Sequence, residues 1–223
     1  WKCDKPLYEN QQQQPKQQDS NVTNGLNNQV LHNNNNKIII NCPHCQAVQP
    51  VDDNVDYFQL FNIEQQQQQN YDIDLDYLRK NYLSLQQNIH PDMNINRSNI
   101  ENEFSSKNSS IINDGYKILR DPYQRAIYML HSVFNIIIDE ANVDSEPELL
   151  LEIMELNEEI EMAINDNDYS KQMIMEKLEE NIEKLKKNLT IAFNELNGDE
   201  ARKLTVRYSY YKNALAKLKS SSL

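Results

Sequence analysis

The chain is poor in glycine, in basic charge and in long apolar runs, and each shortage argues against a class of protein. Three glycines among 223 residues disfavour a turn-rich all-β fold, because tight turns often need glycine. A net charge of −12 argues against a general nucleic-acid surface. No apolar run approaches the roughly 20 residues that span a bilayer. The longest, at residues 133–139, is typical of a buried segment.

Cysteine occurs at three positions, all within the first 45 residues, so a disulfide framework is not expected. Cys42 and Cys45 form a Cys-Pro-His-Cys pair, whose spacing is typical of a zinc knuckle in a reducing compartment. Cys3 is a third candidate ligand, because a long loop can bring it back to the pair. The alternative is that these are thiols of a disordered tail that hold no metal. Because the chain starts at Trp1, we expect a fragment or a processed product.

Asparagine and glutamine dominate residues 1 to about 41, with uninterrupted runs at residues 11–14 and 33–36. Such a segment buries too little apolar surface to offset the conformational entropy of the chain, so it is predicted to be disordered. A further glutamine run, at residues 65–69, is interpreted as a loop insertion. Prion-like assembly is disfavoured because the tracts are short and lie beside well-patterned helices.

From residue 56 onward the apolar spacing predicts helices only. A short aromatic helix lies within residues 56–63, and a second helix runs to His90. The third covers about residues 98–120, and a fourth follows Pro122. After a polar linker at residues 139–148 come three long helical patterns, at residues 149–164, 169–196 and 199–218. Alternating steps of three and four along the last pattern predict a helix bundle.

His90, Pro91 and Asp92 end the second helix, and their sequence allows two interpretations. Pro91 disfavours helical geometry at His90, and a cationic histidine suits a helix C-terminus, so the three residues could simply be a stop signal. Alternatively, the loop is the tip of a helical hairpin and presents the Asp92 carboxylate to a partner. A catalytic role is disfavoured because no nucleophile or metal ligand lies near in the sequence.

Taken together, the short aromatic helix, the His-Pro-Asp loop and the sequence NDGYKILRDP resemble a J domain. The later sequence LLLEIMELNEEIE, followed by a helix bundle, is similar to the HscB co-chaperones, from about residue 42 to the C-terminus. The resemblance implies an all-α protein in four parts. These are a low-complexity segment with the cysteines (residues 1–55), a J domain (56–138), a linker (139–148) and a three-helix scaffold-binding domain (149–223).

This resemblance also implies two partners and a site for each. His90, Pro91 and Asp92, with Arg79 and Lys80, would activate a DnaK-type chaperone, although J domains usually carry more basic residues on this helix. The IscU-type iron–sulfur scaffold protein would bind exposed residues of the bundle: Leu150, Leu151, Met154, Glu155, Glu158 and Tyr210. For the predicted helix at residues 149–164, the alternative is that it is buried on two sides. On the last helix, Tyr208 and Tyr211 fall on the core side of the pattern and Tyr210 off it.

Metal-binding members of this family carry a Cys-Trp-x-Cys pair, whose last three positions match Trp1 to Cys3. The resemblance therefore implies zinc held by Cys3, Cys42 and Cys45, with a fourth ligand upstream of Trp1. His44 or His32 is a less favoured candidate for the fourth ligand. It further implies a non-enzymatic adaptor of the mitochondrial matrix, with the cytoplasm as a second location, and neither nucleic acid nor membrane as partner. The alternatives are a general J-domain protein for unfolded clients and a zinc-dependent enzyme or nucleic-acid binder.

Overall fold

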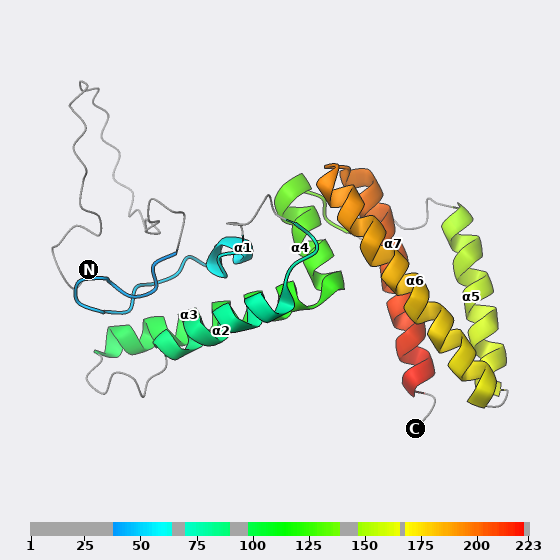
Figure 1. The fold of residues 1–223 in the computed structure, drawn as a ribbon, viewed down its shortest axis with the longest axis horizontal. Helices are drawn as coiled ribbons and strands as arrows, with labels where there is room; N and C mark the ends of the chain where they lie inside the picture. Colours follow the sequence, from blue (N-terminus) through cyan, green and yellow to red (C-terminus); the bar gives the residue numbers. More distant parts are fainter. Residues whose placement is uncertain (1–37, 64–69, 90–97, 139–146, 166–167, 221–223) are drawn as a thin grey trace, which may run out of the picture. The chain divides into compact units, whose positions relative to one another are not determined.

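Regular structure in the described part of the chain is helical, which confirms the predicted all-α class. The computed structural model describes residues 38–63, 70–89, 98–138, 147–165 and 168–220. An isolated antiparallel bridge pairs Asn41 with Val48. The helices, shown in Figure 1, are α1 (Tyr57–Leu60), α2 (Leu75–Ile89), α3 (Asn99–Arg120), α4 (Pro122–Phe134), α5 (Pro147–Asn165), α6 (Asp168–Asn194) and α7 (Gly198–Ser220).

Contacts divide the chain into two compact units. Among the described residues, the hairpin unit comprises 38–63, 74–89 and 98–117, and it contains α1, α2 and most of α3. The bundle unit comprises residues 70–73, 118–138, 147–165 and 168–220 of the described chain, and it contains α4 to α7. Because α4 packs against α7, the last helix of the predicted J domain belongs to the bundle unit. Helical periodicity shows which face of α4 is apolar, but it does not identify the helix that this face meets.

In the hairpin unit, the apolar stripe of α2 packs against α3, as its spacing predicts. Leu78 and Ile89 are buried. The ring of Tyr82 stacks on that of Tyr116 with 4.1 Å between the ring centroids. The Tyr82 hydroxyl also donates a hydrogen bond to Asn113 Oδ1 at 3.0 Å. Aromatic stacking and a half-buried hydrogen bond therefore fix the register of the two helices.

The short helix α1 packs closely against α3 because α3 carries a glycine at the contact. A Cβ atom at Gly115 would lie 2.7 Å from the ring of Tyr57, which is closer than real Cβ contacts allow. At the other end of α1, Asn81 Nδ2 of α2 donates to the carbonyl of Phe61 at 2.7 Å. Phe58 of α1 and Phe61, which caps the end of α1, are fully buried and contribute aromatic side chains to the core of this unit.

Residues 38–55, here called the knuckle segment, are folded onto the hairpin. Cys42 N donates to Ala47 O at 2.8 Å and Gln49 N donates to Ile40 O at 2.7 Å, which closes a tight loop around the cysteine pair. The sequence predicted disorder to about residue 41 and a low-complexity segment to residue 55. The structure differs from residue 38 on, because a run of aliphatic residues gives this segment a buried side: Ile38, Ile40, Val48, Val51 and Val55.

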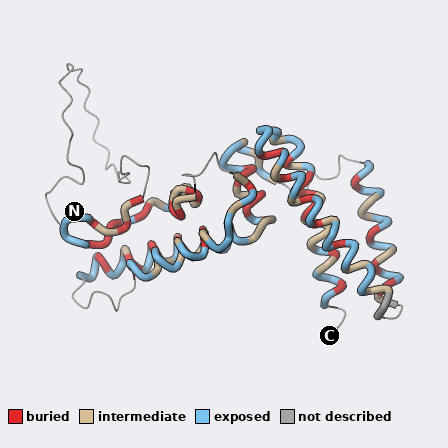
Figure 2. Tube along the Cα trace, in the orientation of Figure 1, coloured by how far each residue is buried: buried red, intermediate tan, exposed pale blue. Residues whose placement is uncertain are grey.

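The bundle unit is held together by one apolar cluster that α5, α6 and α7 share. Ile160 of α5, Leu178 of α6 and Leu218 of α7 are essentially inaccessible to solvent (Figure 2). Tyr211 packs at the edge of this cluster, and Tyr208 is buried, so both lie on the predicted core side of α7. The predicted three-helix bundle is therefore present, with α4 packed against α7 as a fourth helix.

A buried arginine ties the chain before α2 to the start of α4. Arg125 Nε donates to the carbonyl of Tyr71 at 2.8 Å, and its Nη1 donates to the carbonyl of Leu119. The guanidinium carbon lies 5.0 Å from the centroid of the Tyr71 ring, in cation–π geometry. The Tyr71 hydroxyl donates to the carbonyl of Pro122 at 3.1 Å. Residues 70–73 are thereby fixed within the bundle unit.

The carboxylate of Asp121 is expected to stabilise the bundle unit at neutral pH but not in strong acid. It caps α4 by accepting from Tyr123 N at 2.8 Å and Gln124 N at 3.2 Å, and it accepts from Lys212 Nζ of α7 at 2.9 Å. Burial alone would raise the pKa of Asp121, but Lys212 and the two amides outweigh it, and the pKa lies below 3.8. A lowered folded-state pKa stabilises the fold above the unfolded-state pKa, and this stability is lost as the pH falls through the folded-state pKa.

Replacing Asp121 with asparagine keeps the helix cap but removes the charge that pairs with Lys212, so it should cost roughly 0.5 kcal/mol at pH 7 and less near pH 2. Urea unfolding of both proteins at the two pH values measures this difference. Asp199, an exposed acid in the first turn of α7, provides the control substitution with asparagine. A cost for Asp121→Asn that stays the same at both pH values would contradict the assignment.

Candidate functional site

The predicted chaperone-facing surface lies on the solvent side of α2 and on the loop that follows it. Arg79 and Lys80 are both exposed on this helix. His90, Pro91 and Asp92 lie outside the described residues. Ile89, the last residue of α2, is only 2% exposed, so the helix is anchored in the hairpin unit up to the point where this loop begins.

An apolar residue on the same side of α2 was missed by the sequence analysis. Leu83 is 47% exposed and follows Lys80 by three residues, so the two side chains are neighbours on the helix surface. Ser84 and Gln87 are also exposed. The solvent side of α2 therefore offers two cations, an aliphatic side chain and neutral polar groups. The sequence signal that could have identified Leu83 is that it is a leucine outside the apolar stripe of α2.

The outward side of α5 carries an apolar surface that the bundle core does not use. Leu150, Leu151 and Met154 are 38%, 59% and 61% exposed, while Leu149 and Leu156 on the same helix are buried. This arrangement agrees with the predicted division of the helix into core and surface residues. Met162 is also exposed, and it extends the surface beyond the residues that the sequence analysis named. We call Leu150, Leu151, Met154 and Met162 the α5 face.

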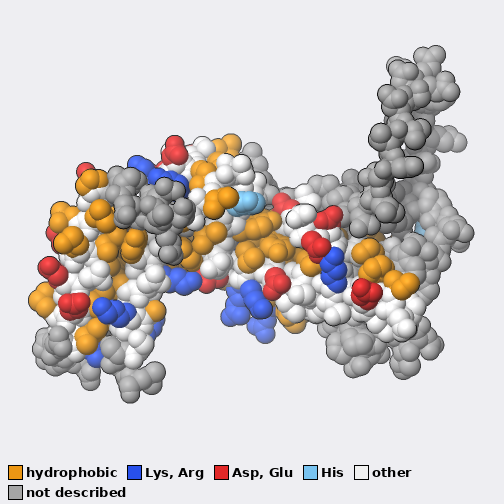
Figure 3. Space-filling model, turned by 180° about the vertical axis from the view of Figure 1, so that it is seen from behind, with side chains coloured by type: hydrophobic (Ala, Val, Ile, Leu, Met, Phe, Trp, Pro, Cys, Tyr) orange, Lys and Arg blue, Asp and Glu red, His pale blue; other side chains and the backbone are white. Residues whose placement is uncertain are grey.

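Acidic side chains surround the α5 face. Glu155 and Glu158 are exposed beside it, and glutamate is the only charged residue type in α5. Figure 3 shows hydrophobic side chains reaching the surface of the bundle unit, at the left of the view, with acidic side chains among them. An exposed apolar patch with a charged rim is typical of a protein-interaction surface, and its charge favours a basic partner.

Polar contacts between α5 and α7 fix the position of this face. Tyr211 donates its hydroxyl hydrogen to Glu152 Oε1 at 2.6 Å, and Arg207 Nη2 lies 3.1 Å from Glu152 Oε2. Burial and the neighbouring Glu152 carboxylate raise the pKa of Tyr211 to about 12, so its hydroxyl remains a donor at physiological pH. Tyr210 is half-buried against a small cluster formed by Leu149 of α5 and Val206 of α7.

The cysteine pair forms a tight turn in the knuckle segment. Cys42 is buried and Cys45 is exposed. The turn is closed by a hydrogen bond from Gln46 N to Cys42 O at 2.9 Å, and Gln46 adopts a left-handed φ of 58°. Cys3 lies outside the described residues. Zinc takes four ligands, and the described ranges contain no group of three or more His, Cys, Asp or Glu side chains placed to hold a metal ion.

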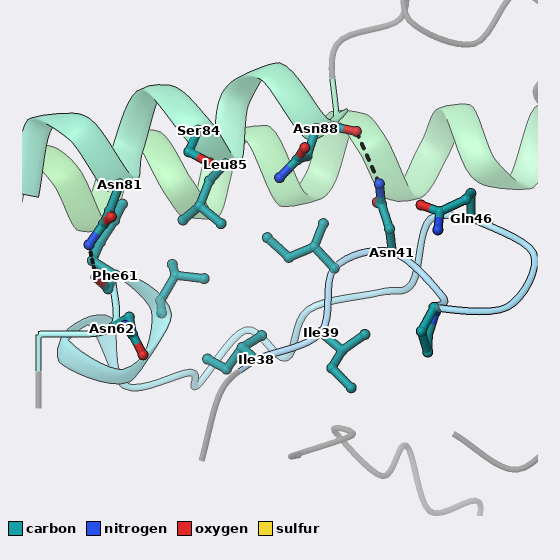
Figure 4. A pocket seen from close by; sticks show the side chains of 13 residues that line it. Ile38, Ile39, Asn41, Gln46, Phe61, Asn62, Asn81, Ser84, Leu85 and Asn88 are labelled. Atoms are coloured by element: carbon teal, nitrogen blue, oxygen red, sulfur yellow. Dashed lines mark hydrogen bonds between the residues drawn. The ribbon is translucent and has the colours of Figure 1, made fainter. Parts of the chain in front are cut away.

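A cavity of about 500 Å³ lies between the knuckle segment and α2 (Figure 4). Ile38, Ile39 and Leu85 contribute to its apolar wall. No charged side chain lines it among the residues described, although a quarter of the chain is charged. Its polar groups are instead carboxamides and one hydroxyl, from Asn41, Gln46, Asn62, Asn81, Ser84 and Asn88.

Within the described ranges, no helix combines the length and the apolar character that crossing a membrane requires.

Comparison with protein families and curated proteins gives consistent matches. The family model described as the HSCB C-terminal oligomerisation domain matches residues 145–219. The chain is 32% identical over 184 residues to the iron–sulfur cluster co-chaperone protein HscB of Mus musculus, which covers 81% of this chain and 74% of the mouse protein. It is 31% identical over 146 residues to the J-type co-chaperone JAC1, mitochondrial, of Saccharomyces cerevisiae, over 63% of this chain and 74% of that protein.

Solved structures give the same relationship. The crystal structure of human co-chaperone protein HscB matches with a TM-score of 0.74 at 30% identity, covering 82% of this chain and 90% of the human one. The Jac1 co-chaperone of Saccharomyces cerevisiae matches with a TM-score of 0.61 at 25% identity, covering 73% of this chain and 94% of the yeast one. A match over 82% of the chain extends beyond the C-terminal helices into the hairpin unit.

Proposed function

Because the chain belongs to the HscB family of iron–sulfur cluster co-chaperones, we propose that it binds an IscU-type scaffold protein and delivers it to a DnaK-type chaperone, whose ATPase it stimulates. The observation that carries this proposal is the α5 face, which the bundle core leaves exposed within an acidic rim. The protein acts as an adaptor and has no catalytic residues of its own.

The proposed scaffold site combines Leu150, Leu151 and Met154 with Tyr210 of α7. Burial of the exposed aliphatic side chains supplies the affinity, because interfaces depend on a few desolvated apolar and aromatic anchors. Glu155 and Glu158 at the rim select a basic partner surface and accelerate its association. The contact between Glu152 and Tyr211 holds α5 against α7, so the site is formed before the partner binds.

The proposed chaperone site is the loop after α2. Asp92 offers a carboxylate to an arginine of the chaperone, which would form a charge-assisted hydrogen bond. Pro91 restricts the backbone at His90 and so defines the turn. Arg79 and Lys80 on the solvent side of α2 attract an acidic chaperone surface. Because the yeast relative is named as a mitochondrial protein, we propose the mitochondrial matrix as the location of this protein.

Zinc is the proposed metal of the knuckle segment. Cys42 and Cys45 would provide two thiolates, Cys3 a third, and a residue upstream of Trp1 the fourth, with His44 or His32 as the less favoured alternative. When bound, zinc would cross-link the segment and take no part in chemistry. Elemental analysis of a chain extended upstream of Trp1 should find one zinc per protein, and substituting serine at Cys42 and Cys45 should abolish it.

A steady-state ATPase assay tests the main proposal. The protein is added to a mitochondrial DnaK-type chaperone with and without the scaffold protein, and phosphate release is measured. A specific adaptor stimulates the chaperone, and the scaffold increases the stimulation beyond the sum of the separate effects. A general J-domain protein would stimulate the chaperone equally with and without the scaffold. A protein that leaves ATP turnover unchanged would refute both functions.

A further inference from the structure

The knuckle segment is attached to both helices of the hairpin. On α3, the fully buried Asn108 donates from Nδ2 to Gln49 O at 2.7 Å and accepts at Oδ1 from Val51 N at 3.0 Å. Its carboxamide thus pairs with the segment as a neighbouring strand would. On α2, Asn41 Nδ2 donates to the carbonyl of Asn88 at 3.4 Å. The segment therefore connects the two helices independently of their mutual packing.

The contact of Asn41 is made at a functionally important place on α2. Asn88 is the penultimate residue of the helix, and carbonyls in the last turn have no donor within the helix. Figure 4 shows Asn41 extending from the knuckle segment to the backbone at Asn88. The next residue, Ile89, is buried, and the proposed chaperone-activating loop starts immediately after it. Asn41 thus supports the end of α2 from which that loop departs.

This contact is held by neutral groups. The cavity beside it is lined by aliphatic side chains, carboxamides and a hydroxyl, without charge among the described residues, so salt does not screen the attachment. Asn41 Oδ1 is buried, and no donor in the described part of the chain reaches it. Replacing Asn41 with alanine removes this unsatisfied acceptor together with the bond to Asn88, so the two effects on stability oppose each other.

We infer that the knuckle segment holds the end of α2 that immediately precedes the proposed chaperone-activating residues, with Asn41 as the positioning residue. The inference rests on the proposed function of His90, Pro91 and Asp92. A carboxylate that must meet an arginine on another protein is effective only when its supporting backbone is held in place. Cys42 follows Asn41 directly, so the cysteine turn and the support of the loop belong to one structural unit.

The test compares Asn41→Ala with Asn88→Ala in the full chain. The first variant removes the donor, whereas the second removes a carboxamide from the same cavity but keeps the accepting carbonyl. Asn41→Ala should raise the concentration that gives half-maximal ATPase stimulation by about twofold, the effect of one long and exposed hydrogen bond, while Asn88→Ala should leave it unchanged. Scaffold binding and the melting temperature should stay near wild type in both, and a merely structural role would not produce this pattern.

Hydrogen exchange provides a readout that does not depend on the chaperone. The amides of residues 86–89 should exchange faster in Asn41→Ala than in wild type, and at the wild-type rate in Asn88→Ala. If the wild-type protein does not stimulate the ATPase, the proposed function is wrong. The exchange rates would then still show whether Asn41 stabilises the end of α2. Unchanged exchange in Asn41→Ala, or equal losses of stimulation in both variants, would overturn the inference. Asn108→Leu, which detaches the segment from α3, should change exchange in the same direction.

Discussion

Replacing Asp92 with asparagine should reduce stimulation of the chaperone's ATPase by about tenfold to a hundredfold. Asparagine has nearly the size and shape of aspartate, so the loop keeps its length and its turn-forming character. What is lost is the negative charge, and a hydrogen bond to a charged group contributes about 1.5–3 kcal/mol. If the carboxylate meets an arginine in the activated complex, neutralising it removes the interaction that distinguishes this complex from a loose encounter.

Single-turnover ATP hydrolysis at saturating co-chaperone measures this effect without interference from product release. Asp76→Asn is a suitable control, because it removes an exposed acid from the opposite end of α2. Circular dichroism should show the same helicity in all three proteins. Wild-type stimulation by the folded Asp92→Asn variant would refute the role given to the loop, whatever the scaffold site does.

Replacing Leu150, Leu151 and Tyr210 together with alanine should weaken scaffold binding by about a hundredfold or more. Anchor residues at interface centres each cost about 2 kcal/mol or more when truncated. Leu150 and Leu151 are exposed, so their truncation leaves the bundle core intact. Tyr210 is half-buried against the cluster of Leu149 and Val206, so its removal also costs some stability. ATPase stimulation in the absence of scaffold should be unchanged.

Isothermal titration calorimetry with the scaffold protein measures this loss. The double variant with only Leu150 and Leu151 replaced separates binding from folding, since neither residue is in the core. Ile191→Ala is the matched control, because Ile191 is an aliphatic residue of α6 that is 54% exposed and outside the α5 face. Scaffold affinity that is lost equally in Ile191→Ala and in the double variant would show that the α5 face is not the site.

The helices were predictable because their apolar spacing is regular. Leu78, Tyr82 and Ile89 on α2 recur at helical intervals, and a core that needs those side chains leaves little choice of backbone. The exposed residues of α5 were predictable for the same reason, since Leu150, Leu151 and Met154 interrupt the core pattern. Periodicity identifies both the buried stripe and whatever apolar residues lie outside it.

The docking of the knuckle segment was not predictable in this way. It depends on Asn108, a polar residue in the middle of α3 whose partners Gln49 and Val51 lie more than fifty positions earlier in the chain. A buried asparagine and an exposed one have the same sequence signature. The grouping of α4 with α7 is similar, because it depends on pairs such as Asp121 with Lys212, which are 91 residues apart.

The anchoring of Tyr71 by Arg125 has a consequence for the length of the glutamine run that precedes it. Residues 65–69 are an uninterrupted run of five glutamines. The backbone is secured on both sides of this repeat, by the bond from Ile63 N to Phe58 O and by the contacts of Tyr71. Doubling the length of a flexible connection costs only about 0.6 kcal/mol. Alleles with different glutamine numbers should therefore encode equally functional proteins.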